Sequence, residues 1–153
     1  MNDAQDTQDS RPIAFGSDHA GLALKRELLA VLEARGEKVV DLGCKNEQSC
    51  DYPDFGHALA AGVADGRYRL GVLVCGTGVG MSMAANRHRG VRAALCTEAF
   101  AARMAREHND ANVLCIGSRV VGPGVAQSIL EAFLAARFEG GRHARRVAKI
   151  DAG

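Results

Sequence analysis

A cysteine followed by alternating glycines is the part of the sequence best suited to chemistry. Residues 70–74 form a short apolar run, Cys75 follows it, and a glycine occupies every second position from 76 to 80. Because a glycine backbone can approach a ligand closely, its amides can surround an anion or an oxyanion. Oriented amides and a following helix N-terminus favour the thiolate, so Cys75 could act as a base or as a nucleophile.

The same glycines also resemble nucleotide-binding motifs, which leaves other interpretations open. The phosphate-binding loop of nucleoside triphosphatases would end in Gly-Lys-Ser/Thr, whereas Met81 and Ser82 follow Gly80. A dinucleotide fingerprint would need its third glycine at position 81, although Glu98 has the spacing of the acidic residue that such a motif expects. A non-catalytic nucleotide-binding module therefore stays an alternative, as does a structural role of the glycines in strand-to-helix packing.

Three polar clusters lie outside the glycine loop, and each also has an ordinary structural interpretation. Asp18 and His19 follow the first apolar run, where an aspartate commonly caps a helix. His108-Asn109-Asp110 is typical of a helix C-terminus. The basic C-terminal cluster consists of Arg137, Arg142, His143, Arg145 and Arg146. It is typical of a solvated surface, and as a nucleic-acid site it lacks interleaved aromatic residues.

The remaining cysteines are weaker candidates for a catalytic or metal-binding role than Cys75. Cys96 and Cys115 lie within or at the end of apolar strands and are expected to be buried like small hydrophobic residues. Cys44 and Cys50 flank a polar loop, and two thiols without a nearby histidine make a poor zinc site.

These residues must be positioned by alternating strands and helices, which predict a parallel sheet with right-handed crossovers. Strands are predicted at residues 12–16, 38–42, 70–74, 91–95 and 113–116. Helices are predicted at residues 22–35, 54–65 (capped by Asp54), 81–86, 99–106 and 125–138. The fold class is α/β, a single Rossmann-like three-layer α/β/α domain with a five-stranded parallel sheet. Since ligands bind outside the carboxyl ends of such strands, residues 17–21, 75–80, 97–98 and 117–119 should share one rim.

Composition fits a single soluble domain. The chain has 153 residues, 47% of them hydrophobic, with a formal net charge of +1, so no field of one sign indicates a nucleic-acid or membrane partner. Residues 1–11 are expected to be a disordered polar tail, and residues 12–153 the domain with its basic C-terminal arm. The absence of an export signal or a membrane-spanning apolar run, with an odd number of cysteines, predicts a cytoplasmic protein with reduced thiols.

Several ordered motifs together resemble the B-type ribose-5-phosphate isomerases, a family that includes the galactose-6-phosphate isomerase subunits. The motifs are Gly16-Ser-Asp18-His19-Ala-Gly21, Asp51-Tyr52-Pro53, Cys75-Gly-Thr-Gly-Val-Gly80, Ala85-Asn86, His108-Asn109-Asp-Ala-Asn-Val, Gly117-Ser-Arg119 and Glu139-Gly-Gly-Arg142-His143. The resemblance extends from Ile13 to about Ile150. It implies interconversion of D-ribose 5-phosphate and D-ribulose 5-phosphate through a cis-enediolate, in the pentose phosphate pathway.

The resemblance also implies catalytic roles. Cys75 would move the proton between C1 and C2, and Thr77 with the loop amides would face the enediolate oxygen. His108 would open the furanose ring, and Asp18 would help to move hydroxyl protons. One branch of the family replaces this cysteine with a glutamate directly after the third glycine. Position 81 is a methionine here, so Cys75 has no rival carboxylate in the loop.

Binding roles follow from the same resemblance. The substrate would be held by Asp18, His19, Gly76, Thr77, Gly78, Val79, Gly80, Asn109, Arg119, Arg142 and Arg146. Of these, Arg142 and Arg146 would bind the phosphate, with Arg119 as a further contact. No cofactor and no metal are expected, and the family implies a homodimer or tetramer with sites shared between subunits. The same isomerisation of galactose 6-phosphate, allose 6-phosphate or a tetrose phosphate stays an alternative, because the named residues do not decide sugar length.

Overall fold

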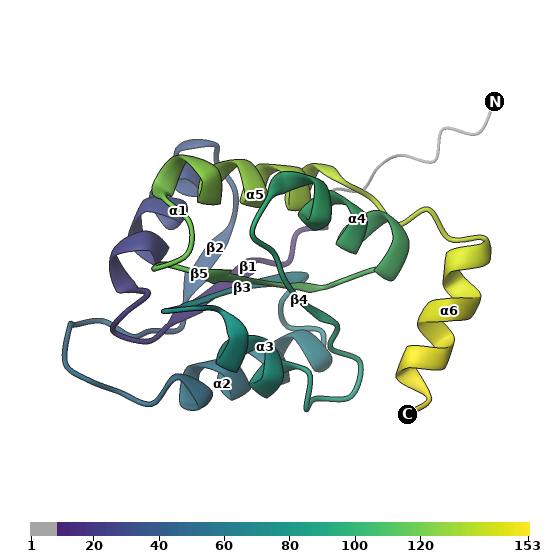
Figure 1. The fold of residues 1–153 in the computed structure, drawn as a ribbon, viewed down its shortest axis with the longest axis horizontal. Helices are drawn as coiled ribbons and strands as arrows, with labels where there is room; N and C mark the ends of the chain where they lie inside the picture. The colour runs from purple at the N-terminus through teal and green to yellow at the C-terminus, as the bar shows by residue number, and fades with distance from the viewer. Residues whose placement is uncertain (1–8) are drawn as a thin grey trace.

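The computed structural model describes residues 9–153 and centres on one parallel sheet (Figure 1). Its strands are β1 (Ile13–Ser17), β2 (Val39–Asp41), β3 (Leu70–Cys75), β4 (Ala93–Leu95) and β5 (Val113–Gly117). They lie in the order β2-β1-β3-β5-β4, and every neighbouring pair is parallel. Parallel neighbours need crossover connections, which helices supply here. The predicted α/β fold with a five-stranded parallel sheet is confirmed.

Helices cover both faces of the sheet. They are α1 (Leu22–Ala34), α2 (Tyr52–Ala64), α3 (Val79–Ala85), α4 (Ala99–Asn109), α5 (Pro123–Ala135) and α6 (Arg142–Asp151). Helices α1, α4 and α5 lie over one face, and α2 and α3 lie over the other (Figure 1). Among the described residues, no helix combines the length and the apolar character needed to cross a membrane. Most of the predicted polar tail, residues 1–8, lies outside the described part of the chain.

The core has two halves because side chains alternate between the two faces of each strand. Val72 and Val74 of β3 pack with the layer of α1, α4 and α5, where Phe133 is also buried. Leu73 and Cys75 point to the opposite face and pack with α2 and α3, beside Met81. The thiol of Cys75 therefore belongs to the α2 and α3 side of the sheet.

Three helix starts differ from the sequence prediction. Helix α3 begins at Val79, two residues before its predicted start at residue 81. Helix α2 begins at Tyr52 with Asp51 in the N-cap position, so Asp54 lies in the first turn and is not the cap. Pro53 explains the earlier start, because proline has no N–H to satisfy and its fixed φ suits a first helical turn. Helix α5 likewise begins at Pro123, two residues before the predicted start, and ends at Ala135.

The basic C-terminal arm forms a helix that is absent from the predicted elements. Arg142 opens α6, and no acidic residue lies in the first turn, so the local charges oppose the helix dipole. His143 and Val147 are the residues that α6 buries. Arg92, which precedes β4, donates to the carboxylate of Asp151 at 3.1 and 3.2 Å. Tertiary contacts thus hold α6 at the edge where the strands begin (Figure 1).

A buried lysine ties α1 to the end of β2. The Lys25 side chain is fully buried, and its Nζ donates to Asp41 Oδ1 and to the Cys44 carbonyl, both at 2.6 Å. Asp41 Oδ1 also accepts the Gly43 N–H at 2.9 Å. A buried ammonium is tolerated only when it is paired, so this network fixes the path of the chain after β2.

Replacing Asp41 by alanine should destabilise the fold, because Lys25 would stay buried without its carboxylate. We expect a loss of about 3 kcal/mol in the free energy of unfolding, at the lower end for a broken buried pair since Asp41 is partly exposed. Urea unfolding of the wild-type and Asp41→Ala proteins at equal concentration measures this loss. Arg103→Ala, which removes the exposed pair with Glu107, should change stability by less than about 0.5 kcal/mol. Equal losses in the two variants would contradict the assigned role.

Candidate active site

Cys75 ends β3 with its side chain buried and a backbone amide directed at the sulfur. The Gly78 N–H donates to Cys75 Sγ at 3.1 Å. This hydrogen bond joins the sulfur to the backbone of the glycine loop. The carbonyl of Cys75 accepts the Ser118 N–H at 2.8 Å, which fixes the end of β3 against the loop after β5. The thiol is therefore held rigidly beside a donor.

The glycine loop is shaped by one left-handed residue and by close packing. Gly78 has φ of 77°, and a Cβ there would lie 2.5 Å from Leu95 Cδ1. Thr77 Oγ1 accepts the Val79 N–H at 3.3 Å, within the same turn. The ring of Tyr52 covers Gly80, where an added Cβ would lie 2.4 Å from Tyr52 Cζ. Helix α3 starts within this loop, at Val79, with Gly78 as its N-cap.

The loop after β1 sits against the end of β3. The Asp18 N–H donates to the Val74 carbonyl at 3.3 Å, and Asp18 Oδ1 accepts the Gly21 N–H at 3.0 Å. Asp18 therefore does not cap α1, whose N-cap is Gly21 without a side-chain cap. Its carboxylate instead fixes the turn between β1 and α1, and β1 is the neighbour of β3 in the sheet. His19 Nδ1 accepts the Cys50 N–H at 3.2 Å, which joins this loop to residues 44–51. Burial raises the pKa of the nearby Cys50 thiol.

Arg119 and Ser118 complete this edge from the loop after β5. The Arg119 N–H donates to the Gly76 carbonyl at 3.0 Å, and the Arg119 guanidinium lies over Gly76, with Nη1 3.4 Å from the position of an added Cβ. Ser118 Oγ donates to the Ala20 carbonyl at 2.8 Å. The loops that follow β1, β3 and β5 therefore meet, as the rule for parallel sheets predicts.

Two other thiols are structural, as predicted. Burial raises the pKa of Cys115 far above its ordinary value, and the neighbouring thiols of Cys75 and Cys96 act in the same direction. Burial and the charge of Glu98 raise the pKa of Cys96 to about 11. Both side chains are buried and pack as small hydrophobic groups. Neither is suited to act as a base near neutral pH.

Glu98 has a role that weakens the dinucleotide interpretation. Its carboxylate caps α4 by accepting the Phe100 and Ala101 N–H groups at 2.7 and 2.6 Å. It follows β4, which is separated from β3 by β5 in the sheet. In the dinucleotide fold the acidic residue follows the strand beside the glycine loop. Glu98 is thus placed and occupied as a helix cap.

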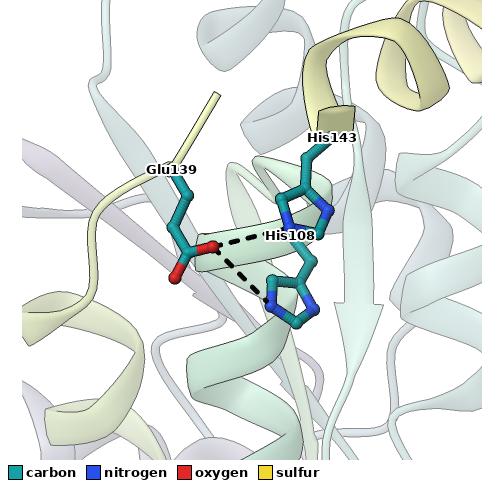
Figure 2. A group of neighbouring side chains, drawn as sticks. All are labelled: His108, Glu139 and His143. Carbon is teal, nitrogen blue, oxygen red and sulfur yellow. Dashed lines mark ion pairs between the residues drawn. The ribbon is translucent and has the colours of Figure 1, made fainter. Parts of the chain in front are cut away.

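A second group of predicted site residues lies at the ends of α4 and α6. His108 and Asn109 form the last turn of α4, and Asp110 follows in the left-handed region with φ of 46°. The ring of His108 stacks on His143, with centroids 4.2 Å apart and planes 9° apart. Glu139 Oε2 lies 3.9 Å from His108 Nε2 and 3.5 Å from His143 Nε2 (Figure 2). The predicted helix C-terminus at His108 is confirmed.

Positive charge surrounds this second group. Arg142 and Arg146 lie one turn apart on α6 with exposed side chains. Burial lowers the pKa of His143, and the charges of His108, Arg142 and Arg146 act in the same direction, while Glu139 opposes them. A groove of about 550 Å³ opens beside Asn109, between the loop before β4 and the end of α6. This surface is suited to an anion such as a phosphate group.

The two groups lie at opposite edges of the sheet within one chain. Cys75 pairs with Gly117 at the carboxyl end of β5, whereas Asn109 precedes Val113 at its amino end. Strand β5 alone spans roughly 13 Å, at about 3.3 Å per residue. The structure brings Asp18, His19, the loop 75–80 and Arg119 together, and it places His108, Asn109, Arg142 and Arg146 elsewhere.

Sequence reasoning assigned no role to three residues at these groups. Tyr52 covers the glycine loop, and Glu139 and His143 surround His108. The four-residue spacing from Glu139 to His143 could have indicated a shared face, but Gly140 and Gly141 interrupt the helical pattern.

Comparison with known proteins places the chain in a family. A family model described as Ribose/Galactose Isomerase matches residues 13–150. Ribose-5-phosphate isomerase B of Escherichia coli is 49% identical over 142 residues, which cover 93% of this chain and 95% of that protein. The D-erythrulose-4-phosphate isomerase of Pectobacterium atrosepticum is 41% identical, with 90% of this chain and 91% of that protein covered.

A solved structure agrees with the sequence relatives. Ribose-5-phosphate isomerase B of Clostridium thermocellum superimposes with a TM-score of 0.91 at 51% identity, over 92% of this chain and 95% of that one. The residues that the family model matches, 13–150, include every strand of the sheet and all but the last residue of α6. The chain belongs to the ribose/galactose isomerase family.

Proposed function

We propose that the protein is an aldose–ketose isomerase that interconverts D-ribose 5-phosphate and D-ribulose 5-phosphate. The observation that carries the proposal is the buried Cys75 thiol at the carboxyl end of β3, with the Gly78 N–H 3.1 Å from its sulfur. Its relative in Escherichia coli, at 49% identity, is named for this activity. The reaction would serve the pentose phosphate pathway in the cytoplasm.

The chemistry needs one base that removes and returns the same proton. In the aldose, the Cys75 thiolate takes the proton from C2, and the electron pair forms the C1–C2 double bond of a cis-enediolate. The resulting thiol then delivers its proton to C1, while a proton moves from O2 to O1, which yields the ketose. Because the two oxygens of a cis-enediolate lie on one side, a single loop can face both of them.

The glycine loop supplies the electrostatic part of this mechanism. Backbone N–H groups of residues 76–80 and the hydroxyl of Thr77 would donate to the enediolate oxygen. Such donors are fixed before the reaction, so they stabilise developing charge without reorganising. Loss of one donor from a site of this kind costs roughly 3 kcal/mol of transition-state stabilisation. Asp18 would move hydroxyl protons, and His19 and Arg119 would contact the substrate.

Ring opening and phosphate binding would come from a second copy of the chain. His108 would open the furanose, Asn109 would bind a hydroxyl, and Arg142 with Arg146 would bind the phosphate. Within one chain these residues lie at the far edge of the sheet from Cys75. Leu95, which lies against Gly78, is 38% exposed, and Met83 of α3 and Phe100 of α4 are 66% and 65% exposed. A homodimer would cover this apolar area and complete two equivalent sites.

Sugar length is the main alternative within the same chemistry. A relative at 41% identity is named for a tetrose phosphate, D-erythrulose 4-phosphate. Rates of the wild-type protein on four-, five- and six-carbon aldose phosphates would separate these substrates. The proposal requires the highest kcat/KM on ribose 5-phosphate, and a protein inactive on all of them would exclude an isomerase.

Replacing Cys75 by alanine should abolish proton transfer while the fold persists. We expect kcat/KM for ketose formation to fall between about 10² and 10⁴-fold, the usual contribution of a general base. Cys96→Ala is the matched control, because it removes a neighbouring buried thiol whose pKa of about 11 makes it inert. The control should keep wild-type activity. A fully active Cys75→Ala protein would exclude the proposed base.

Replacing Gly78 by alanine should disturb the loop more than the fold. Gly36 is the matched control, because its φ of 75° is close to the 77° of Gly78, but an added Cβ there meets no atom within 4 Å. Gly36→Ala should lose about 1 kcal/mol in the free energy of unfolding from the left-handed backbone alone. Gly78→Ala should lose more, because an added Cβ there would also lie 2.5 Å from Leu95 Cδ1 and 3.0 Å from the carbonyl carbon of Ile116. Gly78→Ala alone should also lose activity, on the order of 100-fold, because the loop must shift away from Leu95. Equal activities would contradict a loop that acts on the substrate.

Heterodimers of differently tagged chains would test the shared site. A Cys75→Ala chain paired with a His108→Ala chain should show about half of the wild-type activity, because one site keeps both residues. A wild-type chain paired with the double variant should be inactive, because each site then lacks one residue. Sites confined to single chains predict the reverse result for both pairs.

A further inference from the structure

Three side chains capable of holding a metal ion converge where α4 meets α6. The candidate ligand atoms of His108, Glu139 and His143 all lie within 4.8 Å of one another. Figure 2 shows the Glu139 carboxylate directed at both imidazole rings from the segment that precedes α6. The three residues are 31 and 4 positions apart in the sequence, so the tertiary fold creates the cluster.

A second observation independently indicates a ligand at this point. The His143 side chain is 7% exposed, and its Nε2 is buried without a hydrogen-bond partner among the described residues. Its distance of 3.5 Å from Glu139 Oε2 does not provide a hydrogen bond. A buried nitrogen of this kind costs free energy unless it gains a partner. The neutral ring nitrogen is also the form of histidine that binds metal.

We propose that His108, Glu139 and His143 form a binding site for a divalent transition-metal ion of the Zn²⁺ type. Two imidazoles and one carboxylate are a zinc ligand set that leaves the fourth tetrahedral position open. Nitrogen and carboxylate donors together favour such an ion over Mg²⁺ or Ca²⁺, which prefer oxygen ligands.

Binding needs only a small local change. Tetrahedral ligands with bonds of about 2.05 Å lie roughly 3.3 Å apart, close to the present 3.5 and 3.9 Å from Glu139. The stacked rings must lose their parallel arrangement so that both nitrogens point to one ion. His108 can make this turn, because its side chain is 37% exposed, whereas His143 is fixed by burial.

Neighbouring charges set the strength of the site. Arg142 and Arg146 face His143, and their positive charge opposes a cation. Glu139 supplies the one carboxylate that acts in the other direction. We therefore expect weaker binding than at a structural zinc site, so that the ion exchanges readily.

The site has a regulatory consequence, which rests on the proposed function. An ion on His108 Nε2 would occupy the nitrogen that is to exchange protons with the furanose ring. Zn²⁺ should therefore inhibit ring opening, and a chelator should reverse the inhibition. Glu139 and His143 would hold the ion without acting in the isomerisation itself.

Titration of the full-length protein with Zn²⁺ alone, followed by calorimetry, tests binding without any assay of activity. We expect one ion per chain and at least about tenfold weaker binding in Glu139→Gln and His143→Asn. Glu107→Gln is the matched control, because it removes a neighbouring negative charge without removing a candidate ligand. It should bind as the wild type does, and so should Cys50→Ala.

Co²⁺ replaces Zn²⁺ as a spectroscopic probe of the ligands. Visible bands of a tetrahedral nitrogen and oxygen site are expected, without a thiolate charge-transfer band. The proposal is overturned by a thiolate band, by absence of binding, or by Glu139→Gln and His143→Asn variants that bind with wild-type affinity. Binding that is lost in Cys50→Ala would also overturn it.

Activity assays then connect the site to the reaction. Zn²⁺ should inhibit the wild type, and Glu139→Gln should need at least about tenfold more Zn²⁺ for the same fractional inhibition of its own metal-free rate. A protein that binds Zn²⁺ but isomerises no sugar phosphate would refute the proposed function and leave the metal site standing. An active isomerase that binds no Zn²⁺ would refute only the metal site.

Discussion

Direct contact between backbones holds the carboxyl edge of the sheet together. An added Cβ at Gly21 would lie 2.3 Å from the Val74 carbonyl oxygen, and one at Gly117 would lie 2.6 Å from the Thr77 carbonyl oxygen. The absence of side chains at these two positions lets three loops meet at the end of β3. Cys75 lies at that meeting point, so its thiol is held by main-chain geometry and not by flexible side chains.

The same topology determines what one chain cannot bring together. A helix that connects two parallel strands runs back along the sheet, so its C-terminus lies at the edge where the strands begin. His108 ends such a helix, and α6 is fixed beside it through Arg92 and Asp151. No adjustment of a loop carries these residues past the length of β5 to Cys75. The proposed assignment of both groups to one reaction therefore requires two copies of the chain, because the fold keeps the groups apart within one copy.

Strong local signals predicted most of the fold and one half of the candidate site. The apolar run before Cys75 and the glycines after it fixed a strand, a turn and a helix, and the parallel alternation placed Asp18 and Arg119 at the same edge. Helix α6 is absent from the predicted elements, because Gly140 and Gly141 interrupt the pattern and Arg142 gives no signal for a helix start. The contacts that fix its position come from α4 and Arg92. The start of α2 is set by Pro53 in the first helical turn, and this proline is a stronger signal for a helix start than Asp54 as an N-cap. His108 and Arg142 were identified as site residues through the family resemblance. The periodicity of the sequence alone could not reveal that they lie far from the Cys75 thiol.

The electrostatics at the end of α4 link anion binding to cation binding. Burial lowers the pKa of His143, and the charges of Arg142 and Arg146 act in the same direction. The two arginines would also repel a metal ion at this ring. An anion bound to these arginines offsets their charge, so it reduces the repulsion that a cation at His108 and His143 would meet. An ion held there with an open coordination position could also accept a phosphate oxygen. Phosphate and metal at this site would thus strengthen each other's binding, and by thermodynamic linkage each would raise the other's affinity by the same factor. Because of this coupling, a metal ion would inhibit most strongly when the sugar phosphate is abundant. An inhibitor that simply competed with the sugar phosphate for one position would instead inhibit least under that condition.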